Sequence, residues 1–511
     1  MRYIIAFLLP LIWMDAFAQK HDYIWLTGYS INDSLAGFGG SRLDFNYSPR
    51  SISFFKLPYK FDFDVPCVMS DTAGHLLFYS NGCRIINHQH QTMDNGDDLS
   101  PGPQHDYWCN ISIQNSYIQE QGILAIPYPG HPDQYVLFHS ARAKNDLYTD
   151  ITYHYSIIDM SLNGGLGKVI QKNQHLLGPD SLGRLVTAVR HGNGRDWWVV
   201  LSRHQANVFY LYLLNPQGVQ GPFVRDHRDT WIKGHAWGNL NIFSPDGRRF
   251  HRLTLGRPAA TLLFDFDRCT GEFSHPQRLD LGIALDSAIN YGWSAFSPNS
   301  RFLYLTTDGA RSLYQYDLQA ADVSASVQRV GVFDGYQQNG LYTSFNALSN
   351  APDGKIYVST GDGTQYMHII HAPDSSGVKC DFRQRDLKVP TYVAFFIPVF
   401  PHFRLYDVPG SACDTLGINA PSAVREAVSA GTLHLVPNPT SGELRLRVPE
   451  GGALLHQVWL YDLQGRLLQT LRPAAGVPEV DLDLSALPCG AYVLRAHTDG
   501  GAYVGRVMKV E

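Results

Sequence analysis

The sequence predicts an all-β protein in which a β-propeller of seven blades is followed by a small immunoglobulin-like β-sandwich. Three observations predict this fold. Aromatic residues make up 12% of the 511 residues, and 46 Gly and 29 Pro supply turns, a composition that favours strands over long helices. A turn followed by an apolar strand recurs six times between residues 70 and 358. Short strand patterns then resume after residue 432. The length alone favours more than one domain.

The first eighteen residues have the pattern of a signal peptide. Arg2 gives a positive start, Ile4 to Met14 is mostly apolar, and Ala16-Phe17-Ala18 ends the segment with small residues at the cleavage positions. An uncleaved membrane anchor is the alternative, but the apolar run is shorter than the ~20 residues that a span needs. We therefore expect a signal peptide over 1–18, an exported chain, and no transmembrane segment after cleavage.

The repeat is a turn rich in Asp, Pro, Asn and Gly that precedes an apolar-aromatic strand. Pro presets φ at the second turn position, Asp bonds its own backbone, and Gly accepts positive φ, so each copy is expected to join two adjacent antiparallel strands. The turns end at residues 74, 134, 194, 247, 300 and 354, which gives intervals of 60, 60, 53, 53 and 54 residues. A period of this size is typical of one four-stranded propeller blade. An array of β-sandwiches would not require such regular spacing.

Six copies leave the stretches 23–60 and 391–407 without a partner. Because a closed ring removes exposed strand edges, we expect both stretches to join in one more blade. This predicts seven blades over 19–408, with six or eight as alternatives. The architecture resembles WD-repeat and related propellers that carry Pro-Asp-Gly turns, although the Gly-His and Trp-Asp signatures of WD repeats are absent.

The segment 409–431 is rich in Ala, Ser, Gly and Pro, so we interpret it as a linker. Residues 432–511 contain about seven short strand patterns, as expected for a small β-sandwich. A carbohydrate-binding or adhesive module is an alternative for this domain. Its aromatic residues Trp459, Tyr461 and Tyr492 fall within strand patterns, however, and are better explained as core.

The order of motifs in this domain resembles the type A sorting domain of the type IX secretion system of Bacteroidetes. The residues that carry the resemblance are Pro437, Asn438, Pro439, Gly442, Asp462, Gly465, Gly490 and Tyr492, followed by a basic-apolar last strand. The resemblance covers 432–511 and implies that the secretion machinery recognises this domain at the outer membrane. It also implies that the protein is secreted or attached at the outer-membrane surface. Cys489 stands where the family commonly has Ser or another small residue.

Charge and cysteine content restrict the function classes. The formal net charge is -5, so there is no basic field for nucleic acid. Seven cysteines in an exported chain can form disulfides, and at least one must remain unpaired in a monomer. Proximity in sequence suggests the pairs Cys83–Cys109 and Cys380–Cys413.

Candidate metal ligands are few. Asp94, Asp97 and Asp98 offer oxygen ligands for calcium, but the spacing lacks the pattern of a helix-loop-helix calcium site, and a solvated loop is favoured. His88 and His90 alternate and would share one face if they lay on a strand. No His-Glu-x-x-His or Cys-x-x-Cys motif occurs, so the sequence predicts no cofactor, with calcium as the one open candidate.

Two function classes remain open. The first is a non-catalytic propeller that binds an extracellular protein or glycan. The second is a secreted hydrolase or lyase that acts on polysaccharide or peptide. No Gly-x-Ser-x-Gly elbow, phosphate-binding loop or other catalytic signature occurs, so binding is favoured. An aromatic or neutral axial mouth would support binding, and a cluster of acids or histidines would support catalysis. Candidate contact aromatics, most of which would also suit a core, are Trp197, Trp198, Trp231, Trp237 and Trp293.

Overall fold

The computed structural model describes residues 19–510, except for 30–35, 59–60, 65, 113–115, 118–121, 143–149, 205, 231–234, 258–259, 280–291, 308–310, 394–395, 417–428, 449–453, 463–466, 472, 474–476 and 499–500. The chain divides into two compact units, 1–419 and 420–511. The signal peptide expected over 1–18 lies outside the described residues.

In the described part of the first unit, the chain forms seven sheets of three or four strands, each in sequential antiparallel order. The first three sheets consist of β1 (Ile24–Tyr29), β2 (Gly39–Asp44) and β3 (Ser51–Phe55); β4 (Cys67–Ser70), β5 (Leu76–Ser80) and β6 (Ile85–Asn87); and β7 (Ile123–Pro127), β8 (Gln134–Arg142), β9 (Ile151–Asp159) and β10 (Lys168–Asp180).

The next four sheets have four strands each. They are β11 (Leu182–Arg190), β12 (Trp197–Arg203), β13 (Val208–Asn215) and β14 (Gly218–Asp226); β15 (His235–Phe243), β16 (Arg249–Arg257), β17 (Ala260–Asp267) and β18 (Glu272–Leu279); β19 (Trp293–Phe296), β20 (Phe302–Thr307), β21 (Ser312–Asp317) and β22 (Gln328–Val332); and β25 (Phe345–Asn350), β26 (Ile356–Thr360), β27 (Tyr366–Ile370) and β28 (Phe382–Lys388).

A few short elements connect the sheets. The hairpin β23 (Gln337–Gln338) and β24 (Leu341–Tyr342) precedes the last of them. The described helical segments are α1 (Pro103–His105), which continues into a π-helical turn (Asp106–Ile111), and 3₁₀ turns at Asn163–Gly165, Arg228–Thr230, Ser324–Ser326 and Gly377–Cys380.

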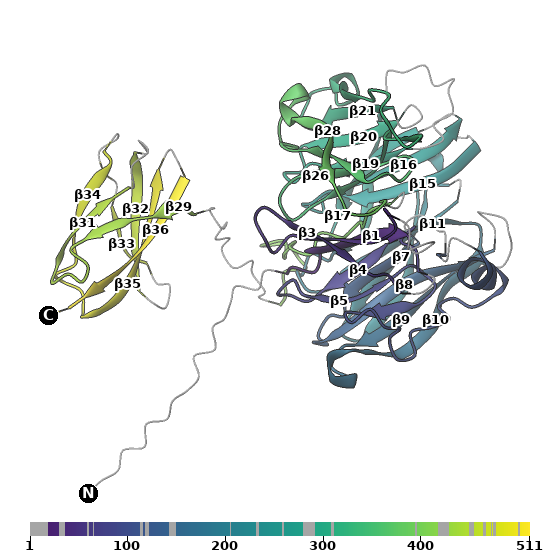
Figure 1. Ribbon diagram of the computed structural model, residues 1–511, viewed down its shortest axis with the longest axis horizontal. Coiled ribbons are helices and arrows are strands. Elements are labelled where there is room, and N and C mark those ends of the chain that lie inside the picture. Colours follow the sequence, from purple (N-terminus) through teal and green to yellow (C-terminus); the bar gives the residue numbers. More distant parts are fainter. Residues whose placement is uncertain are drawn as a thin grey trace, which may run out of the picture. The chain divides into compact units, whose positions relative to one another are not determined.

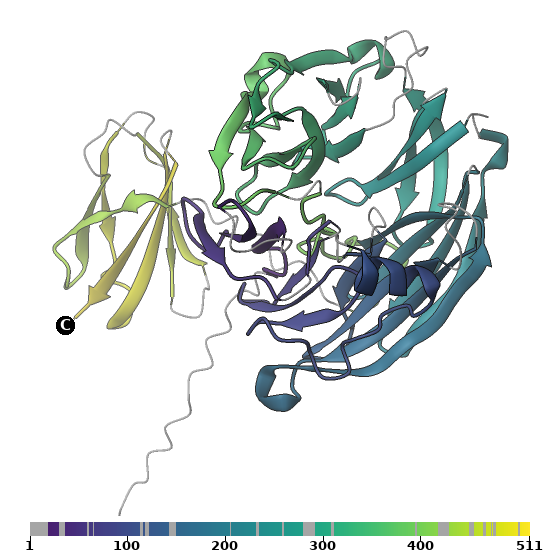
Figure 2. The ribbon, with the colours of Figure 1, turned by 45° about the vertical axis from the view of Figure 1, so that its right-hand side comes forward.

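The sheets follow one another around a common centre (Figure 1; Figure 2). The first strand of each sheet contacts the first strand of the next, in the order β1, β4, β7, β11, β15, β19, β25. The last sheet also contacts the first, because Tyr357 on β26 packs against Trp25 and Phe45 with ring-centroid distances of 5.4 and 5.7 Å. Arg50 and Asp353 pair across the same junction at 3.7 Å. The arrangement is therefore a closed, β-propeller-like ring.

All six predicted turns connect the first and second strands of a sheet, and each lies in a different sheet. In the turn after β15, the Gly247 amide donates to Ser244 O at 2.8 Å and Ser244 Oγ donates to Asp246 Oδ1 at 2.5 Å. Each turn contains one residue of positive φ, as the Asp/Asn/Gly-rich sequence requires. These residues are Gly74, Asp133, Gly194, Gly247, Ser300 and Gly354.

The two ends of the ring meet as predicted, but they do not pair as strands of one sheet. Stretches 23–60 and 391–407 do meet, since Ser41 and Thr391 share a hydroxyl hydrogen bond of 2.7 Å and Tyr392 N donates to Gly37 O at 2.7 Å. The described residues of 391–407 form no strand, however. Instead, this segment continues across the ring centre, where Phe400 and Phe403 pack into the core.

Each interface between neighbouring sheets is filled by apolar side chains. Phe209 on β13 packs against Phe250 on β16 and Phe264 on β17 with centroid distances of 5.3 and 5.7 Å. These side chains come from alternating aromatic strands whose inward positions face the next sheet. Burial of this kind stabilises the ring by roughly 1.5–3 kcal/mol per large side chain.

The second unit contains two sheets around its own core. One sheet has the order β29 (Ser429–Thr432), β36 (Gly501–Lys509), β35 (Gly490–Thr498), β32 (Leu455–Tyr461) and β33 (Leu467–Leu471), and the other the order β30 (His434–Val436), β31 (Glu443–Arg447) and β34 (Glu479–Asp483). Leu444, Leu460 and Leu494 are among the buried residues between them. Strand β29 begins inside the segment predicted as linker, because Ser429–Thr432 pairs in parallel with β36.

Candidate functional site

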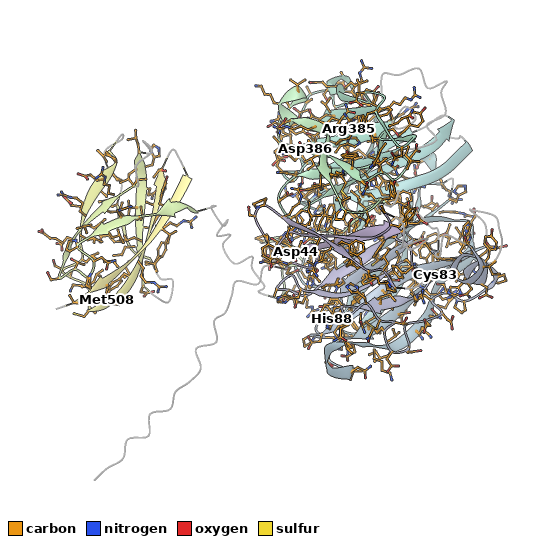
Figure 3. The ribbon with its side chains drawn as sticks, viewed as in Figure 1. Asp44, Cys83, His88, Arg385, Asp386 and Met508 are labelled. Carbon is orange, nitrogen blue, oxygen red and sulfur yellow. A yellow bond between two sulfur atoms is a disulfide. The ribbon has the colours of Figure 1, made fainter. Side chains whose placement is uncertain are left out.

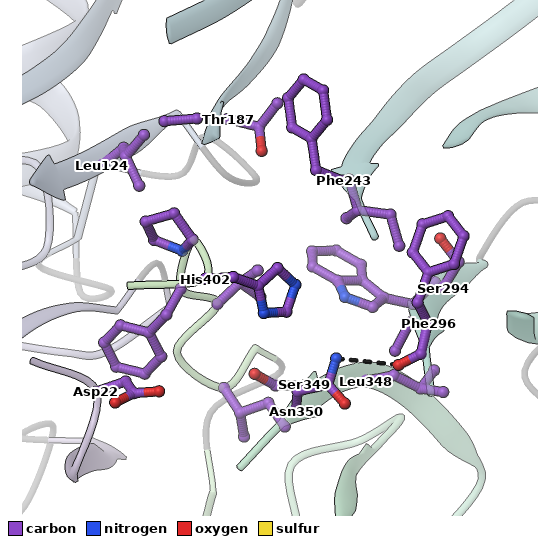
Figure 4. A pocket seen from close by; sticks show the side chains of 18 of the residues that line it. Asp22, Leu124, Thr187, Phe243, Ser294, Phe296, Leu348, Ser349, Asn350 and His402 are labelled. Carbon is purple, nitrogen blue, oxygen red and sulfur yellow. Dashed lines mark hydrogen bonds between the residues drawn. The ribbon is translucent and has the colours of Figure 1, made fainter. Parts of the chain in front are cut away.

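A cavity of about 100 Å³ lies among the first strands of the sheets, at the ring centre (Figure 4). It is lined by residues of β7, β11, β15, β19 and β25 and by the segment 396–404, which crosses it. The lining residues used below are Asp22, Thr187, Phe243, Trp293, Ser294, Phe296, Ser349, Asn350, Phe396, Phe400, His402 and Arg404.

Small side chains on the inner strands leave room for this cavity. Thr187 and Ala188 on β11 and Ser294 and Ala295 on β19 line the cavity, where the first strands of several sheets converge. Trp293-Ser294-Ala295-Phe296 forms β19, the first strand of its sheet.

The segment 396–404 is held in place by hydrogen bonds from three sides of the ring. Ser349 Oγ on β25 donates to Pro398 O at 2.7 Å, and Arg190 Nη2 on β11 donates to Phe403 O at 3.2 Å. Arg404 forms a bidentate ion pair with Asp22, with N···O distances of 2.6 and 2.7 Å. The Arg404 side chain is 41% exposed, whereas Asp22 is buried.

His402 extends into the cavity between Phe243 and the Ser349–Asn350 edge (Figure 4). Burial, together with the positive charge of Arg404, lowers the pKa of His402 to about 4. Behind Ser294 lies His251, which shares a hydrogen bond of 2.9 Å with the Ser294 hydroxyl. Burial lowers the pKa of His251 to about 3. Both imidazoles are therefore neutral at pH 7, and the charge in the lining is confined to the Asp22–Arg404 pair.

Two buried polar atoms of lining residues have no hydrogen-bond partner. The Asn350 amide nitrogen donates to Phe296 O at 3.0 Å, which leaves Asn350 Oδ1 as an unpaired acceptor (Figure 4). The indole Nε1 of Trp293 is an unpaired donor. Buried polar groups are normally satisfied by protein, water or ligand. An aromatic cavity with one donor and one acceptor left over suits a small group that can both donate and accept, such as a hydroxyl or an amide.

Of the five tryptophans predicted as contacts, Trp293 is the one that the structure places in the cavity lining. Trp197 is fully buried, with the Arg190 guanidinium 4.1 Å from its ring, and Trp198 Nε1 donates to Arg268 O at 2.9 Å. These two residues belong to the core. Trp231 lies outside the described residues, as does the side chain of Trp237.

The loop that carries the weak calcium candidates packs on a strand. Asp94 pairs with Lys168 at 3.0 Å, and the carbonyls of Asp97 and Asp98 accept from Lys172 and Asn173. Throughout the described ranges, no three His, Cys, Asp or Glu side chains are grouped to hold a metal ion.

His88 and His90 do not lie on a strand, so they share no strand face. Strand β6 ends at Asn87, and the chain then turns, with φ 63° at His90. The His90 ring stacks on Phe55 at 4.8 Å and shares a hydrogen bond of 2.9 Å with the Tyr79 hydroxyl. His88 is exposed (Figure 3).

The disulfides are Cys83–Cys109 and Cys269–Cys413. The first is the pair suggested by proximity in sequence. The second suggestion, Cys380–Cys413, is wrong, because Cys413 bonds to Cys269 on the turn after β17, 144 residues away along the chain. Cys380 is a buried free thiol. The first residues of the predicted linker are therefore attached to the ring.

The described residues of the predicted sorting motif lie toward one end of the second unit. Asn438 lies beside the last strand, where its Nδ2 donates to Arg506 O at 2.7 Å and its Oδ1 accepts from Met508 N at 2.9 Å. The Leu484 amide donates to Gly442 O at 2.8 Å, and the buried Tyr492 donates its hydroxyl to Pro488 O at 2.6 Å. The remaining positions are Pro437 and Pro439 beside Asn438, Asp462 after β32, Gly490 at the start of β35, and Gly465, which lies outside the described residues.

Sequence reasoning missed His402 and Asn350. A signal for Asn350 exists in the repeat itself. The residue before the Ser/Ala-Pro turn is Phe243 in one copy and Phe296 in the next, but Asn350 in the last. A polar residue at an aromatic repeat position marks a site where the ring departs from its own pattern. His402 has no such signal, because segment 396–404 lies outside the repeat.

Comparison with known families identifies a family for the C-terminal part of the chain. Residues 434–510 match the family described as "Secretion system C-terminal sorting domain". This type IX sorting tail indicates export to the cell surface or beyond it. No curated protein matches the chain. None of the described helices is long and apolar enough to cross a membrane.

Several solved structures resemble the chain at low identity. A Lactobacillus plantarum protein has 14% identity and a TM-score of 0.41, over 74% of this chain and 99% of that one. The Pseudomonas aeruginosa periplasmic gluconolactonase PpgL has 13% identity and a TM-score of 0.40, over 73% and 98%. The β-propeller domain of Cps50 (Swd1) from Myceliophteria thermophila has 11% identity and a TM-score of 0.29, over 77% and 98%. Likenesses at this level carry no functional argument.

Proposed function

We propose that this chain is an exported or cell-surface propeller that binds a protein or glycan, and that a polar group of the ligand enters the axial cavity. In this proposal the seven sheets are seven blades over 19–408, 1–18 is a signal peptide, and 409–431 links the ring to an immunoglobulin-like sorting domain over 432–511. The closed chain of contacts from β1 to β25 and back supports the blade number.

The observation that carries the proposal is the chemistry of the cavity lining. Aromatic and neutral side chains dominate it, and the Trp293 donor and Asn350 acceptor are buried without partners. Such pockets bind by apolar contact and use a few placed polar groups for orientation. A sugar hydroxyl or a peptide amide supplies both complementary groups.

Catalysis is the second candidate, and His402 is the observation that favours it. This residue could accept a proton from a bound substrate. With a pKa of about 4, however, it is a weak base at pH 7, and the described lining contains no second acid or base apart from Asp22, which is paired with Arg404. Binding is therefore the better-supported function.

The test uses the chain from residue 19, with its sorting domain, on a glycan array and against a displayed peptide library. Affinities of the best ligands are then measured by calorimetry. Trp293→Phe removes the donor but retains a ring, and Asn350→Leu removes the acceptor at similar volume. Each loses one hydrogen bond to the ligand, so we expect about fivefold to tenfold weaker binding. Gln217→Leu, in an exposed turn, is the matched control and should bind normally.

Two results would reject the proposal. If both cavity variants bound every ligand like the wild type, the axial cavity would not be the binding site. If the wild type cleaved a chromogenic glycoside or peptide and His402→Gln abolished this turnover, the chain would be an enzyme.

A further inference from the structure

Strand β3 has a free edge. It is the outermost strand of the first sheet, and β2 pairs with one side of it along its whole length, from Ser51 opposite Asp44 to Phe55 opposite Gly40 (Figure 1). In an antiparallel ladder, alternate residues point their N–H and C=O groups away from the partner strand. No described residue outside β2 forms a hydrogen bond with the backbone of β3. A row of backbone donors and acceptors is therefore open at this edge.

The other outer strands of the ring carry features that prevent edge pairing. Proteins protect exposed edges with charged residues, prolines or β-bulges. Strands β10, β14, β18, β22 and β28 each contain at least one charged residue and each have a register shift against the neighbouring strand, and three of them also contain proline. The edge of β6 is covered instead, because residues 91–96 form backbone hydrogen bonds with it.

Strand β3 has none of these protective features. Its sequence, Ser51-Ile52-Ser53-Phe54-Phe55, contains no charge and no proline, and its pairing with β2 has no bulge. The Phe54 ring lies over the bare backbone of Gly39 and is still 55% exposed. Arg50, which precedes the strand, is turned toward the ring, 3.7 Å from Asp353. A regular, uncharged edge of β-branched and aromatic residues is suited to pairing with another strand.

We infer that β3 pairs with β3 of a second copy of this chain, antiparallel and centred on Ser53. The strand is complementary to itself in this register. Ser53 meets the partner's Ser53 on the two-fold axis, and Ile52 lies opposite the partner's Phe54 on one face of the sheet. Pairs of a β-branched and an aromatic residue stabilise antiparallel sheets. Since neither strand contains a charged residue, the two copies meet without repulsion between the paired residues.

The pairing closes at two copies. Among the described outer strands of the ring, only β3 has such an edge, so a two-fold contact uses both edges and leaves none open. The two three-stranded sheets become one sheet of six strands, which is a common size. Because a five-residue ladder buries less surface than a standard interface, we expect the copies to associate at roughly 10–100 µM. The inference is independent of what the axial cavity binds.

Sedimentation equilibrium of the chain from residue 19 measures this association. Ser53→Lys places two ammonium groups opposite each other on the axis, so we expect it to weaken association about tenfold. Gln220→Lys is the matched control, because it adds the same charge at an exposed position of another outer strand, β14. It should associate like the wild type. Thermal unfolding of each variant shows that the ring remains folded.

Cysteine cross-linking tests the register. All variants carry Cys489→Ser, because Cys489 is an exposed free thiol. Ser53→Cys should form a disulfide between copies, because directly opposite Cβ atoms are about 4.5–5.5 Å apart. Ser51→Cys is the control on the same strand. Ser51 is also exposed, but the same residue of the partner is displaced by four positions, about 13 Å along the strand. Non-reducing electrophoresis compares the two rates.

Three results would overturn the inference. A wild type that stays monomeric throughout has no such contact. A Ser53→Lys variant that dimerises normally uses another surface, and equal cross-linking of Ser51→Cys and Ser53→Cys excludes the proposed register. A monomeric chain that captures an extended peptide from a displayed library, and loses it in Ser53→Lys, would assign the edge to a different protein and also reject the second copy. Weaker association in Ser53→Lys together with selective cross-linking of Ser53→Cys supports the dimer.

Discussion

Asp64 is a buried carboxyl group that should make stability depend on pH. Its burial, and the nearby charge of the buried Asp62, raise the pKa of Asp64 from 3.8 to about 7, although Tyr29 donates a hydrogen bond to it. The folded state therefore binds this proton more tightly than the unfolded state does. Stability from this group is complete below about pH 4 and is lost as pH rises through 7. We expect Asp64→Asn to raise the free energy of unfolding at pH 8 by a few kcal/mol and to change it much less at pH 4.

Urea denaturation at both pH values measures this difference. Asp98→Asn serves as the control, because Asp98 is exposed and its replacement should have similar small effects at the two pH values. If the benefit of Asp64→Asn were equal at pH 4 and pH 8, the raised pKa would be wrong.

At the residue level, the sequence predicted turn residues better than site residues. Gly247 and Asp246 act locally, so their roles follow from the turn sequence alone. The cavity residues Asn350 and His402 meet only because the ring closes and a segment crosses its centre. The pairing of Cys413 with Cys269 depends on the same crossing, which proximity in sequence does not encode.

Among the elements, the last strand of the sorting domain depends on Asn438. This one side chain both donates to Arg506 O and accepts from Met508 N, so Asn438→Ala removes two hydrogen bonds. We expect a loss of about 2 kcal/mol from the second unit. Hydrogen exchange of the Met508 amide in the full chain should accelerate correspondingly. Gln469→Ala, at an exposed position of β33, should leave it unchanged. Unchanged protection in Asn438→Ala would show that the motif asparagine does not hold this strand.

The segment that crosses the ring should depend on its disulfide. Cys269–Cys413 joins residues 144 apart, against 26 for Cys83–Cys109, and a longer closed loop restricts the unfolded chain more. We expect the Cys269→Ser/Cys413→Ser double variant to lower the stability of the ring by roughly 2–5 kcal/mol, about 1.5 kcal/mol more than Cys83→Ser/Cys109→Ser. Urea midpoints under non-reducing conditions compare the two. Equal losses would show that strain or residual structure outweighs loop length.

Hairpins were the most predictable elements, because each of the six turns carries its own turn chemistry. The segment 391–407 was the least predictable. Its apolar residues were expected to form a strand, but Phe400 and Phe403 instead fill the ring centre. The segment pairs with no strand because it contains Pro398 and Pro401, and because the carbonyls of Pro398 and Phe403 accept hydrogen bonds from side chains of the ring. Similarly, β29 begins within a segment whose composition indicates a linker, because pairing with β36 outweighs local propensity.

For the whole molecule, regular repeat spacing was enough to predict a ring of separate sheets, since each hairpin can bury its aromatic face only against the next sheet. The hairpins at Gly194, Gly247 and Gly354 lie in three separate sheets, as this reasoning requires. Ligand identity was not predictable from the same pattern, because the axial lining combines residues from five sheets and a crossing segment.

The two units have separate cores, so export and folding should be separable. No hydrophobic cluster of the described residues combines side chains from both units: one contains residues 433–507 with their neighbours, and the others end by residue 405. Removal of 432–511 should therefore leave a folded ring that retains the Cys269–Cys413 bond and its unfolding transition. Because 434–510 is the sorting domain, we expect this truncated protein to accumulate in the periplasm, as measured by cell fractionation and immunoblotting. Fusion of 409–511 to a signal-bearing reporter should carry the reporter to the surface or the medium. A truncated chain that still left the cell would mean that export is directed by the ring itself.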